Sequence, residues 1–116
     1  MLIIDDDPAF LALVGRIVEE LEVRVVVTAA DAGQGLELAV ESRPDAVLVD
    51  VGLPDRGGID LAYELSELPW RPRVVLTSSD REAFVAIETR GPDHRLPFIA
   101  KEELASDSLR RALLDG

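Results

Sequence analysis

The sequence predicts an α/β protein in which helices cover both faces of a parallel sheet. Five short apolar segments alternate with five segments whose apolar residues recur every three or four positions. Glycine, proline and aspartate, which favour turns, separate most of these segments. Strict alternation of strands and helices is typical of a parallel sheet sandwiched between helices. Ligands of such sheets bind beyond the carboxyl ends of the strands, so we expect the functional residues there.

The first strand is expected over Leu2–Ile4. Asp7 before Pro8 indicates a helix N-cap followed by proline in the first helical position. The helix that begins there is expected to bury one face, made by Phe10, Leu13, Val14, Ile17, Val18 and Leu21. A second strand is expected over Val23–Val27, and a second helix follows Asp31. Helical spacing places three of its residues inward: Leu36, Ala39 and Val40.

The segment Ala46–Val49 is a continuous apolar run that ends at Asp50, as expected of a central strand covered on both faces. The loop over residues 52–58 is dense in turn formers, and the third helix after it should end before Pro69. The inward residues of this helix are expected to be Leu61, Leu65 and Leu68.

The fourth strand is expected over Arg73–Leu76 and the fifth over Leu96–Ala100. Between them, Ser79 and Glu82 have the spacing of a capping box for a short fourth helix. Ser106 is expected to cap the last helix. The inward residues of these two helices are Ala83, Phe84 and Ile87, then Leu109, Ala112 and Leu113.

Length and composition limit the classes of protein to which the chain can belong. Its 116 residues fit one domain, expected to span residues 1–116, with the mixture of apolar and charged residues of a folded globular protein. No apolar run approaches the ~20 residues of a membrane-spanning helix, and no export leader precedes the first strand. We therefore expect a cytoplasmic protein without membrane insertion. The formal net charge of −11 opposes direct binding to nucleic acid.

Polar side chains follow four of the five predicted strands. Because the carboxyl ends of parallel strands meet at one edge of the sheet, these side chains are expected to converge. The residues are Asp5, Asp6 and Asp7 after the first strand, Asp50 after the third, Thr77 and Ser78 after the fourth, and Lys101 after the fifth.

Carboxylates that are brought together repel one another unless a cation joins them, and their hard oxygen ligands suit Mg²⁺. A carboxylate that attacks phosphorus forms an aspartyl phosphate, a reaction that needs positive charge on the phosphoryl oxygens more than it needs a base. Lys101 is the only lysine beside eleven arginines, and it ends an apolar strand. The pattern therefore predicts a magnesium site with an ammonium group next to it.

Each of these residues also has a simpler interpretation. Asp7 is more readily explained as a helix cap than as a ligand, and capping or turn formation would explain Asp5, Asp6 or Asp50 separately. Thr77 suits a strand by β propensity, and Lys101 alone would be a solvated charge. Their joint occurrence at predicted strand ends favours a shared site, from which we leave out Asp7.

Four motifs occur in a fixed order along the chain: Leu2–Pro8, Asp50–Gly58, Val75–Ser78 and Phe98–Lys101. Together they resemble the receiver domains of response regulators, and the resemblance spans nearly the whole chain. It implies a (βα)5 flavodoxin-like, doubly wound parallel sheet with strand order 2-1-3-4-5.

The resemblance also implies a role for individual residues. Asp50 matches the phosphoacceptor, and Asp5 and Asp6 match the acid pair. Mg²⁺ would bind directly to Asp6, Asp50 and the backbone carbonyl of Gly52, and through water to Asp5. The remaining matches are Thr77, the hydroxyl that moves toward the phosphoryl group, Lys101, the ion-pairing lysine, and Phe98, whose rotamer reports the switch. Core packing is the alternative role for Phe98.

By the same resemblance, a sensor histidine kinase or phosphotransfer protein would donate the phosphoryl group, and an output domain or partner protein would respond. A homodimer is also compatible with it. The expected chemistry is limited to self-catalysed phosphorylation and dephosphorylation. Two features depart from the family pattern: Glu102 follows Lys101 where many relatives have proline, and residues 88–95 lack an Ala-Gly-Ala-like turn.

Two other functions remain open at this stage. An aspartyl-phosphate phosphatase commonly has an Asp-x-Asp pair on one strand, and Asp50-Val51-Gly52 lacks the second acid. A degenerate receiver that binds proteins without phosphorylation is favoured by the unusual fourth helix. The complete set of site residues opposes it.

Overall fold

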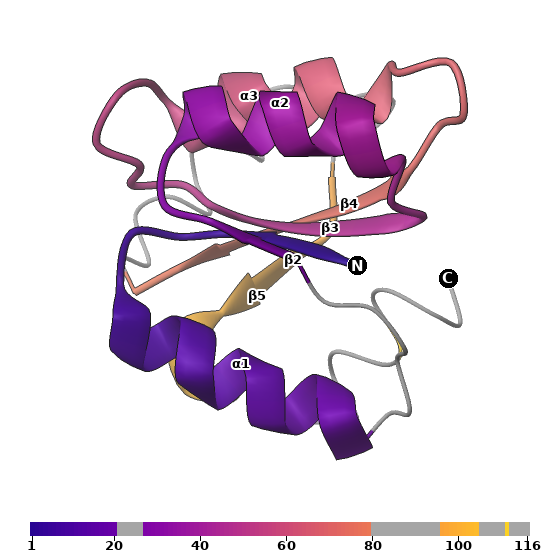
Figure 1. Ribbon diagram of the computed structural model, residues 1–116. Helices are drawn as coiled ribbons and strands as arrows, with labels where there is room; N and C mark the ends of the chain where they lie inside the picture. Colours follow the sequence, from indigo (N-terminus) through magenta and orange to yellow (C-terminus); the bar gives the residue numbers. More distant parts are fainter. Residues whose placement is uncertain (21–26, 80–95, 105–110, 112–116) are drawn as a thin grey trace.

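The computed structural model describes residues 1–20, 27–79, 96–104 and 111. Five parallel strands form one sheet in the order β2-β1-β3-β4-β5 (Figure 1). This order and the doubly wound α/β class confirm the predicted fold. The strands are β1 (Leu2–Ile4), β2 (Val27–Ala29), β3 (Ala46–Asp50), β4 (Arg73–Ser78) and β5 (Phe98–Ala100).

Three α-helices and one 3₁₀ turn are described: α1 (Pro8–Glu20), α2 (Ala32–Ser42), α3 (Gly58–Ser66) and η2 (Lys101–Glu103). The predicted fourth helix, the predicted last helix apart from residue 111, Leu21 and most of the predicted second strand lie outside the described residues. Within the described residues, no helix has the length and apolar character required to cross a membrane.

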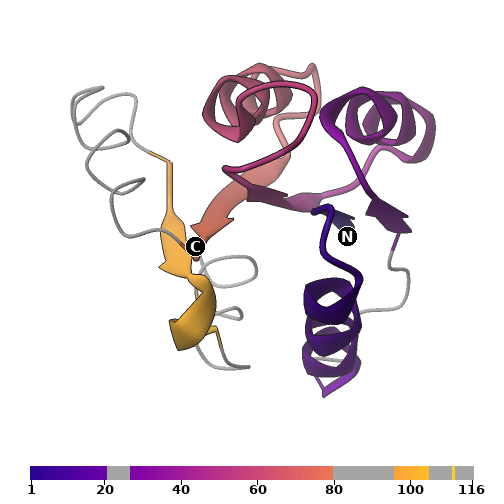
Figure 2. The ribbon, with the colours of Figure 1, turned by 90° about the vertical axis from the view of Figure 1, so that its left-hand side faces the viewer.

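Helices α2 and α3 cover one face of the sheet and α1 covers the other (Figures 1 and 2). Alternate strand residues point to opposite faces. Leu2 and Ile4 of β1 therefore join the core beneath α2 and α3, while Ile3 joins the core against α1. In β3, Val47 and Leu48 divide between the two cores in the same way. Burial on both faces explains the continuous apolar runs of the central strands.

The starts of α1 and α2 follow the predicted capping pattern. The Asp7 carboxylate accepts a hydrogen bond from the backbone N–H of Ala9 at 3.0 Å. Asp31 is the N-cap of α2 and accepts from the backbone N–H of Gln34 at 2.8 Å. Asp7 is thus explained by local structure.

Two residues predicted to face inward are exposed instead. Leu13 in α1 is 46% exposed and Val40 in α2 is 62% exposed. The sheet covers only a narrow stripe of each helix, made by Phe10, Val14 and Val18 in α1 and by Ala32, Gly35 and Ala39 in α2. Neighbouring helix residues point about 100° apart, so a residue directly beside this stripe is turned toward solvent.

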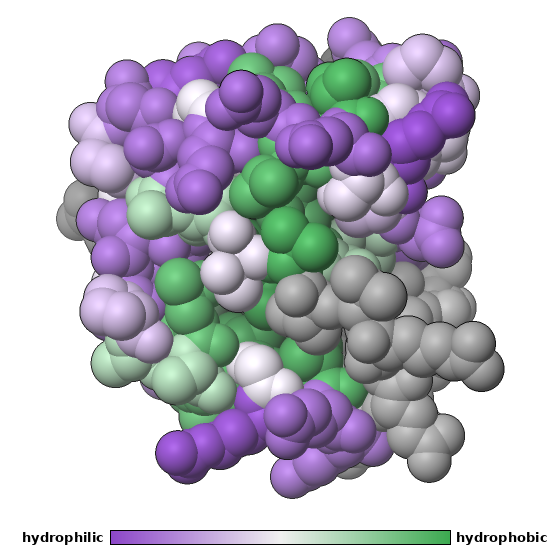
Figure 3. All heavy atoms as spheres, viewed as in Figure 1, coloured by the Kyte–Doolittle hydropathy of each residue, from purple (hydrophilic) through white to green (hydrophobic). Residues whose placement is uncertain are grey.

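The face with the β2 edge shows the same layering at the surface. In Figure 3 an apolar band runs between the polar outer surface of α2 above and that of α1 below. The outer surfaces of the two helices therefore flank an edge of the sheet, and no strand beyond β2 is present among the described residues.

Trp70 packs at the end of the sheet where β3 begins. Its indole N–H donates to the carbonyl of Pro44 at 3.0 Å, and the Arg43 guanidinium lies 4.8 Å from the ring centre. The ring therefore has a packing role, away from the strand ends that carry the acidic residues.

Helix α3 begins directly beneath the end of β3, and this requires a glycine. A Cβ atom on Gly58 would lie 2.0 Å from the backbone oxygen of Asp50 and 2.7 Å from the Cα of Val51. Both neighbours are backbone atoms, which cannot rotate away. The Gly58 N–H also donates to the carbonyl of Val51 at 3.1 Å, so the loop between β3 and α3 is closed at its base.

We predict that Gly58→Ala lowers the free energy of unfolding by about 3 kcal/mol or more, because the methyl group would overlap the backbone of β3. Gly15→Ala is the matched control. A Cβ there meets nothing within 4 Å, and alanine in a helix interior should raise stability by about 1 kcal/mol. Urea denaturation of both variants tests this, and equal stability of Gly58→Ala and the wild type would contradict it.

Candidate functional site

Three carboxylates meet where β1 and β3 end. Asp5 directly follows β1 and Asp50 is the last residue of β3, and these two strands are paired in parallel. Asp6 joins them from the loop after β1. Ligand oxygens of the three residues lie within 4.8 Å of one another. We call Asp5, Asp6 and Asp50 the acidic cluster; Asp5 and Asp50 are buried, while Asp6 is exposed.

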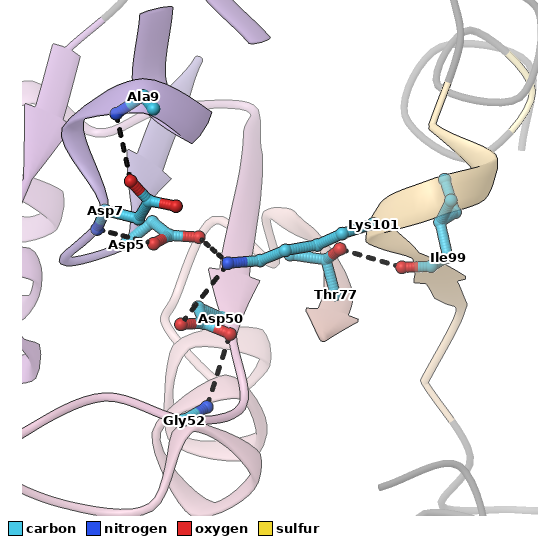
Figure 4. A network of polar contacts seen from close by, with 8 residues as sticks. All are labelled: Asp5, Asp7, Ala9, Asp50, Gly52, Thr77, Ile99 and Lys101. Atoms are coloured by element: carbon cyan, nitrogen blue, oxygen red, sulfur yellow. Dashed lines mark hydrogen bonds and ion pairs between the residues drawn. The ribbon is translucent and has the colours of Figure 1, made fainter. Parts of the chain in front are cut away.

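The backbone and side chain of Asp5 are both fixed. Its N–H donates to the carbonyl of Ala29 at 3.0 Å, and its Oδ1 accepts from the N–H of Asp7 at 2.9 Å (Figure 4). Its Oδ2 lies 2.8 Å from the Lys101 ammonium. Apart from this ion pair, the buried Oδ2 has no hydrogen-bond partner within the described part of the chain. The Lys101 ammonium is therefore the only described partner of this buried oxygen.

The Lys101 side chain reaches the acidic cluster from the end of β5. Its Nζ lies 2.8 Å from Asp5 Oδ2 and 3.8 Å from Asp50 Oδ2 (Figure 4). The ammonium also lies 4.3 Å from the centre of the Phe10 ring, close enough for a cation–π contact. Because only 17% of the side chain is exposed, Lys101 is not the solvated charge of the simpler interpretation.

Thr77 lies opposite Asp50 in the sheet but its hydroxyl points elsewhere. The two residues are register partners of β4 and β3, and the Val51 N–H donates to the Thr77 carbonyl at 2.9 Å. The buried Thr77 hydroxyl donates to the carbonyl of Ile99 at 2.8 Å (Figure 4). The Thr77 side chain therefore faces β5 and contacts Ile99. The residue before Ile99 is Phe98, which is half-buried and packs against the core beneath α2 and α3.

Burial and repulsion make the ionised form of Asp50 unfavourable. Burial raises the pKa of its carboxyl above the ordinary value, and the charge of Asp5 raises it further. The Lys101 ammonium and a hydrogen bond from the Gly52 N–H at 3.3 Å lower this pKa, but the net direction is upward. A second positive charge at the cluster would reverse this effect.

The residues present fit a divalent cation. Three carboxylates face a single ammonium within the described residues, so negative charge is in excess. All the side-chain donors are hard oxygens, and the exposed Asp6 leaves one side of the cluster open to water. This combination suits Mg²⁺, which retains several waters and binds through one or two carboxylates.

Two contacts at the site were not predicted from the sequence. Phe10 was expected only in the core, and it also contacts the Lys101 ammonium. Asp55, expected only as a turn residue, accepts hydrogen bonds from the backbone N–H groups of Ala32 and Gly33 at 2.8 and 2.9 Å. These bonds hold the pKa of Asp55 below its ordinary value. Both contacts join residues far apart in the sequence, and no local pattern signals them.

Comparison with known proteins gives a consistent result. The family described as "Response regulator receiver domain" matches residues 1–112. A probable transcriptional regulatory protein of Mycobacterium tuberculosis, TcrX, is 35% identical over 106 residues, which are 88% of this chain and 45% of that protein. The positive alginate biosynthesis regulatory protein of Pseudomonas aeruginosa is 30% identical over 115 residues, 97% of this chain and 46% of the relative. The chain thus spans less than half the length of these relatives.

Solved structures share the fold. A CheY-like response regulator receiver domain protein from Methanospirillum hungatei superposes with a TM-score of 0.72 at 30% identity, covering 95% of this chain and 86% of the other. The beryllofluoride-activated N-terminal receiver domain of RstA from Klebsiella pneumoniae has a TM-score of 0.76 at 24% identity, covering 95% of this chain and 92% of that one. At that level of identity the second likeness shows the fold alone.

We predict that Asp50→Asn stabilises the metal-free protein at neutral pH by a few degrees in Tm. The folded state raises the pKa of Asp50, so its ionised form costs stability above that raised pKa. This cost disappears as the pH falls toward the ordinary carboxyl pKa of about 3.9, and the advantage of the variant should disappear with it. Thermal melts in EDTA at several pH values measure the difference. A variant less stable than the wild type at pH 7 would contradict it.

Lys101→Met should destabilise the metal-free protein by roughly 3 kcal/mol, because it leaves the buried Asp5 carboxylate without its cation. Adding Asp5→Asn should recover most of this loss. Arg56→Met, which breaks the exposed 2.9 Å pair with Glu64, is the control and should cost less than about 1 kcal/mol. Urea denaturation gives the free energy of unfolding of the wild type and of the three variants. Similar losses of stability for Lys101→Met and Arg56→Met would exclude a special role for the buried pair.

Proposed function

We propose that this chain, which belongs to the response regulator receiver family of two-component signalling, accepts a phosphoryl group on Asp50 in a Mg²⁺-dependent reaction. One observation carries the proposal. The Lys101 ammonium lies 2.8 Å from Asp5 and 3.8 Å from Asp50, the two buried members of the acidic cluster. A carboxylate nucleophile with a cation beside it is the arrangement that phosphoryl transfer to aspartate needs.

In the proposed reaction, a carboxylate oxygen of Asp50 attacks the phosphorus of a phosphohistidine. The new O–P bond forms as the P–N bond breaks, and the leaving nitrogen takes one proton from water, so that the histidine departs as neutral imidazole. Lys101 is close enough to exchange part of its pairing with the carboxylates for a phosphoryl oxygen. Asp5 would keep the ammonium in place during this exchange, since the two charges already lie 2.8 Å apart.

Mg²⁺ would supply the positive charge that the phosphoryl oxygens need. Asp6, Asp50 and the Gly52 carbonyl are its proposed direct ligands, with Asp5 acting through water. The excess of carboxylates in the cluster supports this assignment. The upward pKa direction of Asp50 supports it too, because a cation would restore the ionised nucleophile.

The response to phosphorylation would begin at Thr77. Its hydroxyl now donates to the Ile99 carbonyl, and a phosphoryl group on Asp50 would offer a charged acceptor in the neighbouring strand. Release of Ile99 would free the β5 backbone beside Phe98, whose side chain is only half-buried. We assign Thr77 and Phe98 to the switch on these grounds.

The proposed donor is a sensor histidine kinase or phosphotransfer protein, and the response is read by an output domain or partner protein. Residues 1–116 would act as one cytoplasmic domain, without direct contact to nucleic acid and with no catalytic activity beyond turnover of its own phosphoaspartate. A homodimer is compatible with this role.

Incubation with acetyl phosphate and Mg²⁺ should add one phosphoryl group to the wild type and none to Asp50→Asn, as measured by intact mass. EDTA should abolish the modification, and Lys101→Arg should slow it, because guanidinium cannot replace a compact ammonium at this position. Absence of modification with intact folding would favour a phosphorylation-independent binding module. Release of phosphate over many turnovers per chain, at a rate well above the hydrolysis of the isolated phosphoaspartate, would favour a phosphatase.

A further inference from the structure

The loop over residues 51–57 leaves Asp50 and carries Gly52, the proposed carbonyl ligand. Near the strand it is held by the hydrogen bond from the Gly52 N–H to Asp50 Oδ1 and by the burial of Leu53. At its far end, Gly58 packs against the backbone of Asp50. Between these points the loop is exposed; Arg56 pairs with Glu64 of α3 at 2.9 Å, and Asp55 makes the described contact with α2.

Asp55 uses both carboxylate oxygens to hold the start of α2. Oδ1 accepts from the Ala32 N–H at 2.8 Å, and Oδ2 accepts from the Gly33 N–H at 2.9 Å. These N–H groups belong to the first turn of a helix, where no intrahelical acceptor is available and the helix dipole favours a negative charge. A carboxylate bound twice in this way fixes the position of the loop as well as the helix end.

Asp55 is not the only residue that caps α2. The helix already has Asp31 as its N-cap, bonded to Gln34 at 2.8 Å. A Cβ on Gly33 would lie 3.6 Å from an oxygen of each of the two aspartates, so both carboxylates crowd the same helix end. Asp55 binds the N–H groups of Ala32 and Gly33, whereas Asp31 binds that of Gln34. Unlike Asp31, Asp55 is also the described tie between the helix and the loop.

The start of α2 is itself fixed relative to the acidic cluster. The Asp5 N–H donates to the Ala29 carbonyl at 3.0 Å, and the Ala30 N–H donates to the Gln34 side chain at 2.9 Å. A chain of hydrogen bonds thus runs from Asp5 to the first turn of α2. Asp55 connects the first turn of α2 to the loop after Asp50, so the loop is linked to Asp5 through α2 as well as through the sheet.

We propose that Asp55 is a positioning residue for phosphoryl transfer: by tying the loop to α2, it sets where the Gly52 carbonyl lies relative to the acidic cluster. This inference rests on the proposed function of the cluster. Groups that orient metal ligands in this indirect way commonly change metal affinity by tenfold or more when removed.

Two alanine variants separate positioning from helix capping. Asp55→Ala and Asp31→Ala each remove one negative charge and one cap from the same end of α2, but only Asp55→Ala releases the loop. The Mg²⁺ dissociation constant is measured by NMR, from backbone amide shifts during titration with MgCl₂. The rate of phosphorylation by acetyl phosphate is then measured at saturating Mg²⁺.

Both variants should lower Tm, but only Asp55→Ala should raise the Mg²⁺ dissociation constant, by about tenfold. Equal dissociation constants for the two variants would overturn the inference. Asp55→Asn keeps one acceptor oxygen and should give a smaller increase; it decides the question if Asp55→Ala does not fold. A wild type that binds Mg²⁺ but is never phosphorylated would overturn the proposed function instead, while the contrast in Mg²⁺ affinity would still decide the role of Asp55.

Discussion

Repulsion within the acidic cluster is the constraint on which the rest of the site depends. Two of its three carboxylates are buried, where water cannot screen their charges effectively. The fold nevertheless forces them together, because Asp5 and Asp50 sit at the ends of paired central strands with apolar residues on both faces. The free energy stored in this repulsion is what makes the cluster receptive to cations.

Lys101 relieves part of that repulsion and reaches the cluster from the edge strand β5. It follows β5, and two strands, β4 and β3, separate β5 from β1. The ammonium therefore joins the ends of strands that are not neighbours, with the Phe10 ring of α1 beside it. A single side chain thus contacts residues of β1, β3 and the first helix from the end of β5. A rearrangement at the cluster can therefore change the position of β5.

Much of the site could be predicted because the positions of parallel strand ends follow from the sequence pattern. The placement of Asp5, Asp50 and Thr77 at one edge needed only the strand limits and the alternation of elements. Contacts that depend on side-chain reach between distant segments could not be predicted. The ties of Asp55 to α2 and of Lys101 to Phe10 are of this kind. The helical periodicity also predicted a buried face wider than the one that the structure has. Val40 was therefore expected in the core, but it is exposed.

The position of Trp70, the only tryptophan of the chain, has a practical consequence. Its indole is bonded to Pro44, before β3 begins, whereas Asp50 ends that strand. Four residue steps of extended chain, from Ala46 to Asp50, separate the two ends of β3 by about 13 Å. The tryptophan fluorescence of this protein should thus report its global unfolding without direct quenching by a ligand bound at the acidic cluster.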